Sequence, residues 1–342
     1  MPVVVVYSIC GWFAQIKDTD KARSLLFPGC VGVYRNEDDM IKKMEFRDLV
    51  LIIGVTVMWG SNFTVIDFSL DGIDPFILTA LRFTFCALPL VFFIPKPKGV
   101  STFVTIVYGL LFGIGMCWLM NYGMFLGVSA GVTSLLLQFS AFFTVIWGVL
   151  LFGEKMTAIQ VTGIFMALVG LMFIVHVTDS DAESFGLFLI LLSALFWSLC
   201  NVLVKKSKVV DIFSFVVWSS LYATLPLYLM TYWVKGAAPF QTLLTDITAP
   251  VLVSVLFQAY VATVFGYWVW NRMIEKYPAS QVAPLSVIVP VSGILTSWYV
   301  LDEPIGGEKL FALVITVLGI ALFMNSSKIG RHIAASALYF RR

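Results

Sequence analysis

The chain has 342 residues, of which 60% are apolar and 12% are charged, with a mean hydropathy of +0.94 and a formal net charge of +2. Soluble domains average about 45–50% apolar and about 25% charged residues, so a water-soluble fold has too little interior for this sequence. The composition excludes a soluble enzyme, a nucleic-acid-binding protein and a disordered protein. It predicts an all-α integral membrane protein whose outer face has the lipid bilayer as its partner.

Residues for cofactor or metal chemistry are sparse in the sequence. The five cysteines are scattered without a C-x-x-C pair, His176 and His332 are the two histidines, and no phosphate-binding G-x-x-x-x-G-K pattern occurs. Zinc sites and ATP-driven pumps need such patterns. We therefore expect no metal, no cofactor and no ATP-driven step.

Crossing the hydrocarbon core of a bilayer takes about 20 apolar residues in a helix. Runs of this kind, bounded by charge, proline or glycine, predict ten spans with short connections, and the boundary near Ser129 has no charged loop. The predicted spans are residues 48–70, 76–94, 102–126, 130–152, 157–176, 184–204, 212–234, 250–273, 279–301 and 308–326.

Lysine and arginine are distributed unevenly between the two sets of connections, and cytoplasmic loops carry the excess of these residues. The poorer set holds two, Lys235 and Lys309, and the richer set with the C-terminal tail holds twelve. The twelve are Lys96, Lys98, Lys155, Lys205, Lys206, Lys208, Arg272, Lys276, Lys328, Arg331, Arg341 and Arg342. We expect a multi-pass protein of the inner or plasma membrane with both termini in the cytoplasm.

The two ends of the chain differ from the spans. Residues 1–47 are mixed in character and lack the basic start of a signal peptide, and we expect translation to begin at Met40 or Met44. Residues 327–342 form a basic tail that suits an anionic inner leaflet.

A shift of 149 residues superimposes two parts of the chain, placing Ala130 on Ala279, Glu154 on Glu303 and Gly170 on Gly319. This predicts two repeats, 48–176 and 184–326, each with five spans. Because five is odd, the second repeat enters the membrane inverted, which is the architecture of secondary transporters with a site near the midplane. The alternative is a gene duplication without a transport role.

Polar and flat aromatic residues recur within the predicted spans, where unsatisfied polar groups are unfavourable. Trp59 with Asn62, and Trp197 with Asn201, place an indole and an amide on one helix face in each repeat. The alternatives are lipid contact and hydrogen bonds between helices. The further candidates for substrate binding are Asn121, Gln138, Tyr260, Tyr267 and Ser286. This set suits a small, net-neutral solute, zwitterions included.

Two charges lie within the first hairpin, Asp67 and Arg82, on either side of a turn near Asp74 and Pro75. Each is about 10 Å below the outer surface at about 1.5 Å per residue, so we predict that they pair. The alternative is that Arg82 meets a substrate carboxylate on the outer side.

Carboxylates and prolines mark the ends and bends of other spans. Glu154 and Glu303 precede spans five and ten, where they suit a helix-capping role, with gating or proton coupling as the alternative. Pro284 and Pro290 in span nine predict a hinge, and span four has no proline at the matching positions. The small residues Gly163 and Ala167 allow close helix packing, either between the two halves of the chain or between two protomers. A homodimer is therefore one of the two alternatives.

Several segments together resemble a known family. They include Trp59-Gly60-Ser61-Asn62, Leu81-Arg82-Phe83, Phe152-Gly153-Glu154, and Val282-Ala283-Pro284-Leu285-Ser286. Residues 48–326 resemble the drug/metabolite transporter superfamily with two EamA-type repeats, and are similar within it to exporters of O-acetylserine and cysteine. The resemblance implies ATP-independent export of small amino-acid metabolites, with broad drug efflux as the alternative. The catalytic groups of an intramembrane enzyme and the soluble module of a scaffold are missing from the sequence.

Overall fold

The computed structural model describes residues 44–152, 156–176, 181–207, 209–277, 282–303, 306–327 and 329–330. Within these residues, nine helices are long and apolar enough to cross a membrane, and a shorter apolar helix covers Pro284–Val300. The described chain contains helices and turns but no strand. The prediction of an all-α membrane fold with ten spans is confirmed.

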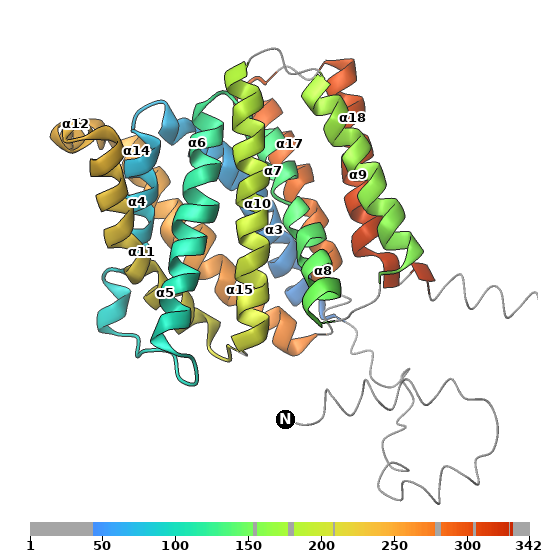
Figure 1. Cartoon of the computed structure of the whole chain (residues 1–342), viewed down its shortest axis with the longest axis horizontal. Helices are drawn as coiled ribbons and strands as arrows, with labels where there is room; N and C mark the ends of the chain where they lie inside the picture. Colours follow the sequence, from blue (N-terminus) through green and yellow to red (C-terminus); the bar gives the residue numbers. More distant parts are fainter. Residues whose placement is uncertain are drawn as a thin grey trace, which may run out of the picture. The chain divides into compact units, whose positions relative to one another are not determined.

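The helices carry the labels of Figure 1. They are α3 (Phe46–Leu70), α4 (Pro75–Ala87), η2 (Leu90–Phe92), α5 (Thr102–Leu110), η3 (Leu111–Trp118), α6 (Leu119–Phe125), α7 (Ala130–Leu136), α8 (Phe139–Phe152), α9 (Ala158–His176), α10 (Asp181–Ser207), α11 (Ile212–Lys235), α12 (Ala238–Gln241), α13 (Leu243–Asp246), α14 (Ala249–Leu256), η4 (Phe257–Phe265), α15 (Gly266–Lys276), η5 (Ala283–Val287), α17 (Ile288–Val300) and α18 (Gly307–Met324).

Local signals in the sequence account for the turns between spans. Asp74 caps α4 by accepting a hydrogen bond from Phe76 N at 2.8 Å, and Pro75 occupies the first helical position, where its missing N–H is not needed. Gly127 has a φ of +106°, and Ser129 then caps α7 through Val132 N. The boundary near Ser129, which no charge marks, is therefore set by a glycine and a capping serine.

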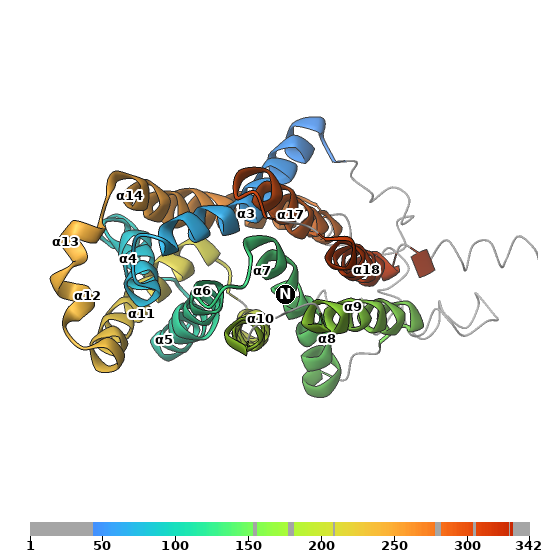
Figure 2. The same cartoon turned by 90° about the horizontal axis from the view of Figure 1, so that it is seen from above.

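The repeats pack against each other reciprocally. The first helix of the first repeat, α3, packs against α17 and against the continuous span α14–η4–α15, while α10 packs against α8 and against α5–η3–α6. Further contacts join equivalent spans of the two repeats, α9 with α18, α4 with α11, and α7 of span four with α17 of span nine. Figures 1 and 2 both show α9 beside α18 at one side of the bundle. A two-fold relation between the repeats produces this pattern, and five spans per repeat make it an inverted one.

The backbone is irregular at matching places in both repeats. The third span of each contains a π-helical segment, η3 or η4, and the fourth span of each is interrupted. The 149-residue shift places Phe139, where α8 begins, on Ile288, where α17 begins. The interruption in span four was not expected, because that span has no proline there. Pro290 lies in the first turn of α17, where an N–H has no partner within the helix.

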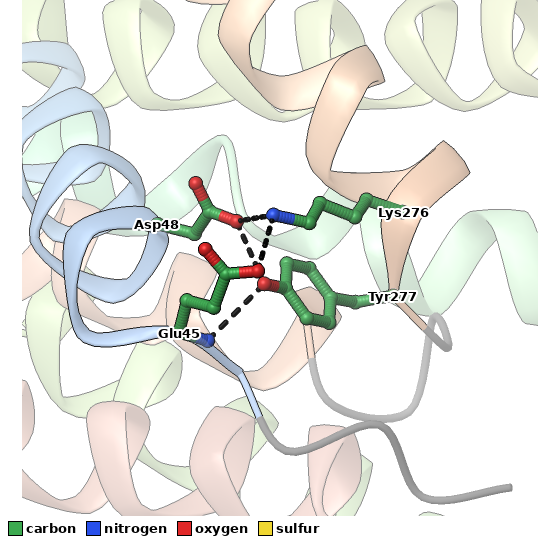
Figure 3. A network of polar contacts seen from close by, with 4 residues as sticks. All are labelled: Glu45, Asp48, Lys276 and Tyr277. Carbon is green, nitrogen blue, oxygen red and sulfur yellow. Dashed lines mark hydrogen bonds and ion pairs between the residues drawn. The ribbon is translucent and has the colours of Figure 1, made fainter.

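A polar cluster ties the start of α3 to the end of α15 (Figure 3). Lys276 Nζ donates to Asp48 Oδ2 at 2.6 Å and to Glu45 Oε1 at 2.9 Å. The Tyr277 hydroxyl donates to Asp48 Oδ2 at 2.6 Å and accepts from Glu45 N at 3.1 Å. The hydrogen bonds to Asp48 and Glu45 raise the pKa of the Lys276 amine above its usual value and so favour its charged form.

Glu303 caps a helix, but not the one that follows it in sequence. Its Oε1 accepts a hydrogen bond from Ala130 N at 3.0 Å, so the carboxylate lies at the N-terminus of α7 in the other repeat. The cap position of α18 is Gly306, without a side-chain hydrogen bond. The expected cap on span ten is therefore replaced by a link between repeats. Glu154 lies outside the described residues.

This geometry predicts the effect of removing the carboxylate. Glu303→Ala should destabilise the fold by about 1 kcal/mol, because the first N–H groups of α7 lose an acceptor and a favourable charge. Glu303→Gln should lose less, since it keeps an acceptor oxygen. Thermal unfolding in detergent measures both variants. Asp71→Ala is the matched control, because this carboxylate is exposed in the turn that follows α3. Equal unfolding temperatures for Glu303→Ala and Asp71→Ala would show that the cap contributes nothing.

Candidate substrate site

A cavity of ≈ 280 Å³ lies between the repeats and is lined by both of them. Seven of the nine residues predicted to bind substrate line it, and the two tryptophan–asparagine pairs are among them. The lining residues are Trp59, Asn62, Phe63, Arg82, Phe112, Met116, Met120, Ser134, Leu137, Gln138, Ser140, Ala141, Trp197, Asn201, Ala262, Tyr267, Trp270, Ser286 and Val289. That these residues bind a substrate stays a prediction.

An aromatic wall forms where α3 meets η4 and α15. Trp59 Nε1 donates to Ala262 O at 2.7 Å, and its ring centroid lies 5.7 Å from that of Tyr267 and 5.3 Å from that of Trp270. The indole N–H is thus occupied by the backbone of the π-helical segment. Trp59 presents its ring rather than its N–H to a ligand.

Gly266 makes this close approach possible. A Cβ atom at Gly266 would lie 2.5 Å from Trp59 Nε1 and 3.0 Å from Trp59 Cε2, closer than atoms pack. The first residue of α15 therefore has to be glycine if Trp59 is to reach Ala262 O.

The interruptions of spans four and nine meet at the cavity. Gln138, which lies between α7 and α8, donates from Nε2 to Ser286 O of η5 at 3.0 Å. This carbonyl of the interrupted span thereby receives a side-chain donor from the other repeat. Asn201 makes a similar link, donating from Nδ2 to Thr144 Oγ1 at 3.2 Å.

Asn62 differs from its counterpart Asn201. Its side chain is 7% exposed, and its Oδ1 has no hydrogen-bond partner. A buried amide oxygen without a partner is unfavourable by about 1–3 kcal/mol. Asn62 therefore holds an unused acceptor beside the cavity.

Arg82 points into the cavity and does not pair with Asp67. Its guanidinium donates from Nη2 to Thr263 Oγ1 at 3.1 Å, Nε has no partner, and the residue is 7% exposed. Asp67 lies instead on the face of α3 that carries Gly60 and Thr64, and this face packs against α17. The side chains of Asp67 and Arg82 point in different directions, so the predicted ion pair is wrong.

The position of Arg82 also changes the expected chemistry of the cavity. A cation at the bilayer centre is unfavourable by about 2.5–3.5 kcal/mol on insertion scales, and a neutral hydroxyl does not neutralise it. Among the described lining residues, Arg82 alone carries a formal charge. The cavity therefore holds a buried cation beside the predicted amides and aromatic rings.

Two candidates lie elsewhere and connect helices. Asn121 is fully buried and donates from Nδ2 to Thr79 Oγ1 at 2.9 Å, and the Tyr260 hydroxyl donates to Leu88 O at 3.2 Å. Neither lines the cavity. Both match the alternative of hydrogen bonds between helices.

The apolar lining residues were not predicted, because polar groups and the repeated tryptophans were the signals used. Phe112, Met116 and Met120 follow one another at four-residue spacing along one helix face, and Trp270 lies one turn after Tyr267. The four-residue spacing was the available signal, but buried packing produces the same pattern.

Comparisons with known proteins agree with this architecture. The model of the EamA-like transporter family matches residues 47–176 and 184–325. A "Probable amino-acid metabolite efflux pump" of Escherichia coli (strain K12) is 32% identical, over 82% of this chain and 95% of the relative. A protein of the same description from Salmonella typhimurium is 33% identical, over 82% of this chain and 95% of the relative. A crystal structure with a TM-score of 0.58 covers 83% of this chain and 97% of its own, and at 17% identity it is evidence for the fold alone.

The position of Gly266 gives a test of the aromatic wall. Gly266→Ala should destabilise the fold by about 1–3 kcal/mol, because the added methyl group displaces Trp59 from Ala262 O. Gly54→Ala on α3 is the control, since a Cβ there meets no atom within 4 Å. That control should be neutral or stabilising, as a helical Gly→Ala change usually is. Thermal unfolding followed by tryptophan fluorescence compares them, and an undisturbed Gly266→Ala protein would disprove the tight contact.

Proposed function

The chain belongs to the EamA-like transporter family, and from this premise we propose that it exports small amino-acid metabolites, such as cysteine and O-acetylserine, by alternating access. Family membership makes it a transporter rather than an enzyme. The efflux of amino-acid metabolites comes from the descriptions of the two relatives.

The observation that carries the proposal is the cavity of ≈ 280 Å³ with polar groups from both repeats. Sites for drug-sized ligands occupy about 300–1,000 Å³. The volume of this cavity is close to the lower end of that range, which suits a small metabolite. Its amides, hydroxyls and aromatic rings suit a weakly held solute. An affinity of about 1 mM corresponds to about −4 kcal/mol, which a few such contacts supply.

Alternating access requires that parts of the protein move relative to one another around the cavity. The interrupted spans α7–α8 and η5–α17 border it, and Pro284 within η5 and Pro290 in the next turn remain the predicted hinges. We propose that the repeats rock about these interruptions, exposing the cavity to one side and then to the other.

Broad-specificity efflux is the second candidate, and the apolar part of the cavity favours it. Met116 and Met120 are adaptable side chains, and they face the same cavity as Trp59, Trp197 and Trp270. Such a lining accommodates aromatic solutes without specific hydrogen bonds. The two candidates differ in the solutes that they carry.

We further propose that the protein lies in the inner membrane with both termini in the cytoplasm. The excess of lysine and arginine on the side where α3 begins supports this orientation. The small-molecule solute and the bilayer are the proposed partners, and the homodimer stays an open prediction.

Flux in proteoliposomes tests the substrate class. Labelled cysteine or O-acetylserine should cross in a protein-dependent manner, and Trp59→Ala and Trp197→Ala should each lower the rate at least ten-fold because the cavity loses its aromatic surface. Trp233→Ala is the control, since Trp233 is 92% exposed on α11. An imposed pH gradient decides whether protons are exchanged. Flux of bulky aromatic cations without flux of any amino-acid derivative would refute the proposal and favour the alternative.

Labelling of single cysteines tests the orientation. With Cys10 and Cys30 replaced by serine, Leu244→Cys should react with an impermeable maleimide on intact cells, because Leu244 is 89% exposed between α11 and α14. Lys98→Cys, between α4 and α5, should react after permeabilisation only. Reaction of both residues from the same side would contradict the proposed topology.

A further inference from the structure

We infer that Arg82 binds the carboxylate of the transported metabolite, while the amide of Asn62 accepts a hydrogen bond from its ammonium group. The inference deepens the proposed export of amino-acid metabolites and rests on it. It assigns a recognition site for the amino-acid headgroup to two side chains of the first repeat.

The first step is the state of the guanidinium. Arg82 is 7% exposed, makes one side-chain hydrogen bond, to the neutral hydroxyl of Thr263, and has a buried Nε without a partner. The ion pairs found among the described residues join Lys235 to Asp74 and Lys276 to Glu45 and Asp48, so none of them involves Arg82. A buried cation without an anion is unfavourable unless a ligand supplies one.

The second step is the choice of anion. A guanidinium offers a planar fork of N–H donors that matches a carboxylate in a bidentate way. Among the described residues that line the cavity, Arg82 is the one with a formal charge, so an anion there meets no competing carboxylate. The volume of ≈ 280 Å³ restricts the ligand to a small acid.

The third step concerns the amino group. Thr263, which holds Arg82, is adjacent in sequence to Ala262, which holds Trp59, and Asn62 lies one helical turn after Trp59. Arg82 and Asn62 line the same cavity, and the Oδ1 of Asn62 is buried there without a hydrogen-bond partner. The faces of Trp59 and Trp270 add favourable contacts for an ammonium group.

A matched set of ligands tests the inference without changing the protein. Cysteine carries both groups, cysteamine lacks the carboxylate, and 3-mercaptopropionate lacks the amine. Binding to the purified, reconstituted protein, followed by the fluorescence of its tryptophans or by calorimetry, should weaken at least ten-fold from cysteine to cysteamine. It should weaken less from cysteine to 3-mercaptopropionate. Equal binding of cysteine and cysteamine would overturn the assignment of Arg82.

Variants locate the two contacts. Arg82→Gln should lower the affinity for cysteine at least ten-fold and leave that for cysteamine unchanged, while Arg82→Lys should retain part of the discrimination. Asn62→Leu should weaken cysteine binding several-fold and leave 3-mercaptopropionate unaffected. Thermal unfolding confirms that each variant folds, and the ligand series on the unmodified protein decides the question if Arg82→Gln does not. Unchanged discrimination in folded Arg82→Gln would overturn the inference.

The same measurements separate the inference from the proposed function. If the unmodified protein transports cysteine, and carries cysteamine equally well, export stands and the role of Arg82 falls. If it transports no amino-acid derivative but binds 3-mercaptopropionate through Arg82, the anion site stands and the proposed cargo falls. Inorganic phosphate is the competing anion in both assays, and binding tighter than that of cysteine would assign the site to phosphate rather than to a carboxylate.

Discussion

Backbone groups in the hydrocarbon core have no water to bond with, so every interruption of a membrane helix needs a partner from the protein itself. In this chain the partners come from the opposite repeat. Trp59 donates to Ala262 O of η4, Gln138 donates to Ser286 O of η5, and Ser193 donates to Met116 O of η3 at 2.8 Å. Each contact joins a side chain of one repeat to a backbone carbonyl of an irregular segment in the other repeat. Two of these contacts, Trp59 with Ala262 and Gln138 with Ser286, join residues that also line the cavity.

Electrostatics gives the cavity its second property. In the cluster of Asp48 and Lys276, at the start of α3 and the end of α15, charges meet opposite charges. Arg82 is different, because it is buried beside the cavity and bonded to a hydroxyl. A site with one cation and an aromatic wall is polarised, so a dipolar solute has a preferred orientation in it. A wholly apolar cavity of the same size would not impose one.

The fold could be predicted from the sequence because its signals are local and periodic. Runs of apolar residues set the spans, Asp74 and Ser129 set helix starts, and the 149-residue shift revealed the repeats. The tryptophan–asparagine pairs were found because both repeats carry them. Contacts between distant segments were not predictable. Asp67 and Arg82 lie at a similar distance from their shared turn, but their side chains point in different directions around the helix axes. Glu303 caps α7 rather than α18. Depth follows from counting residues, whereas direction depends on which helices pack together.

The partner of Arg82 has a consequence for biosynthesis. Arg82 and Thr263 are separated by 181 residues, so the ribosome delivers the arginine long before the hydroxyl that receives its hydrogen bond. Nascent chains acquire structure from the N-terminus onward. The second span is therefore synthesised well before the hydroxyl that accepts the hydrogen bond of its guanidinium. A chain that ends before Thr263 would lack this acceptor altogether.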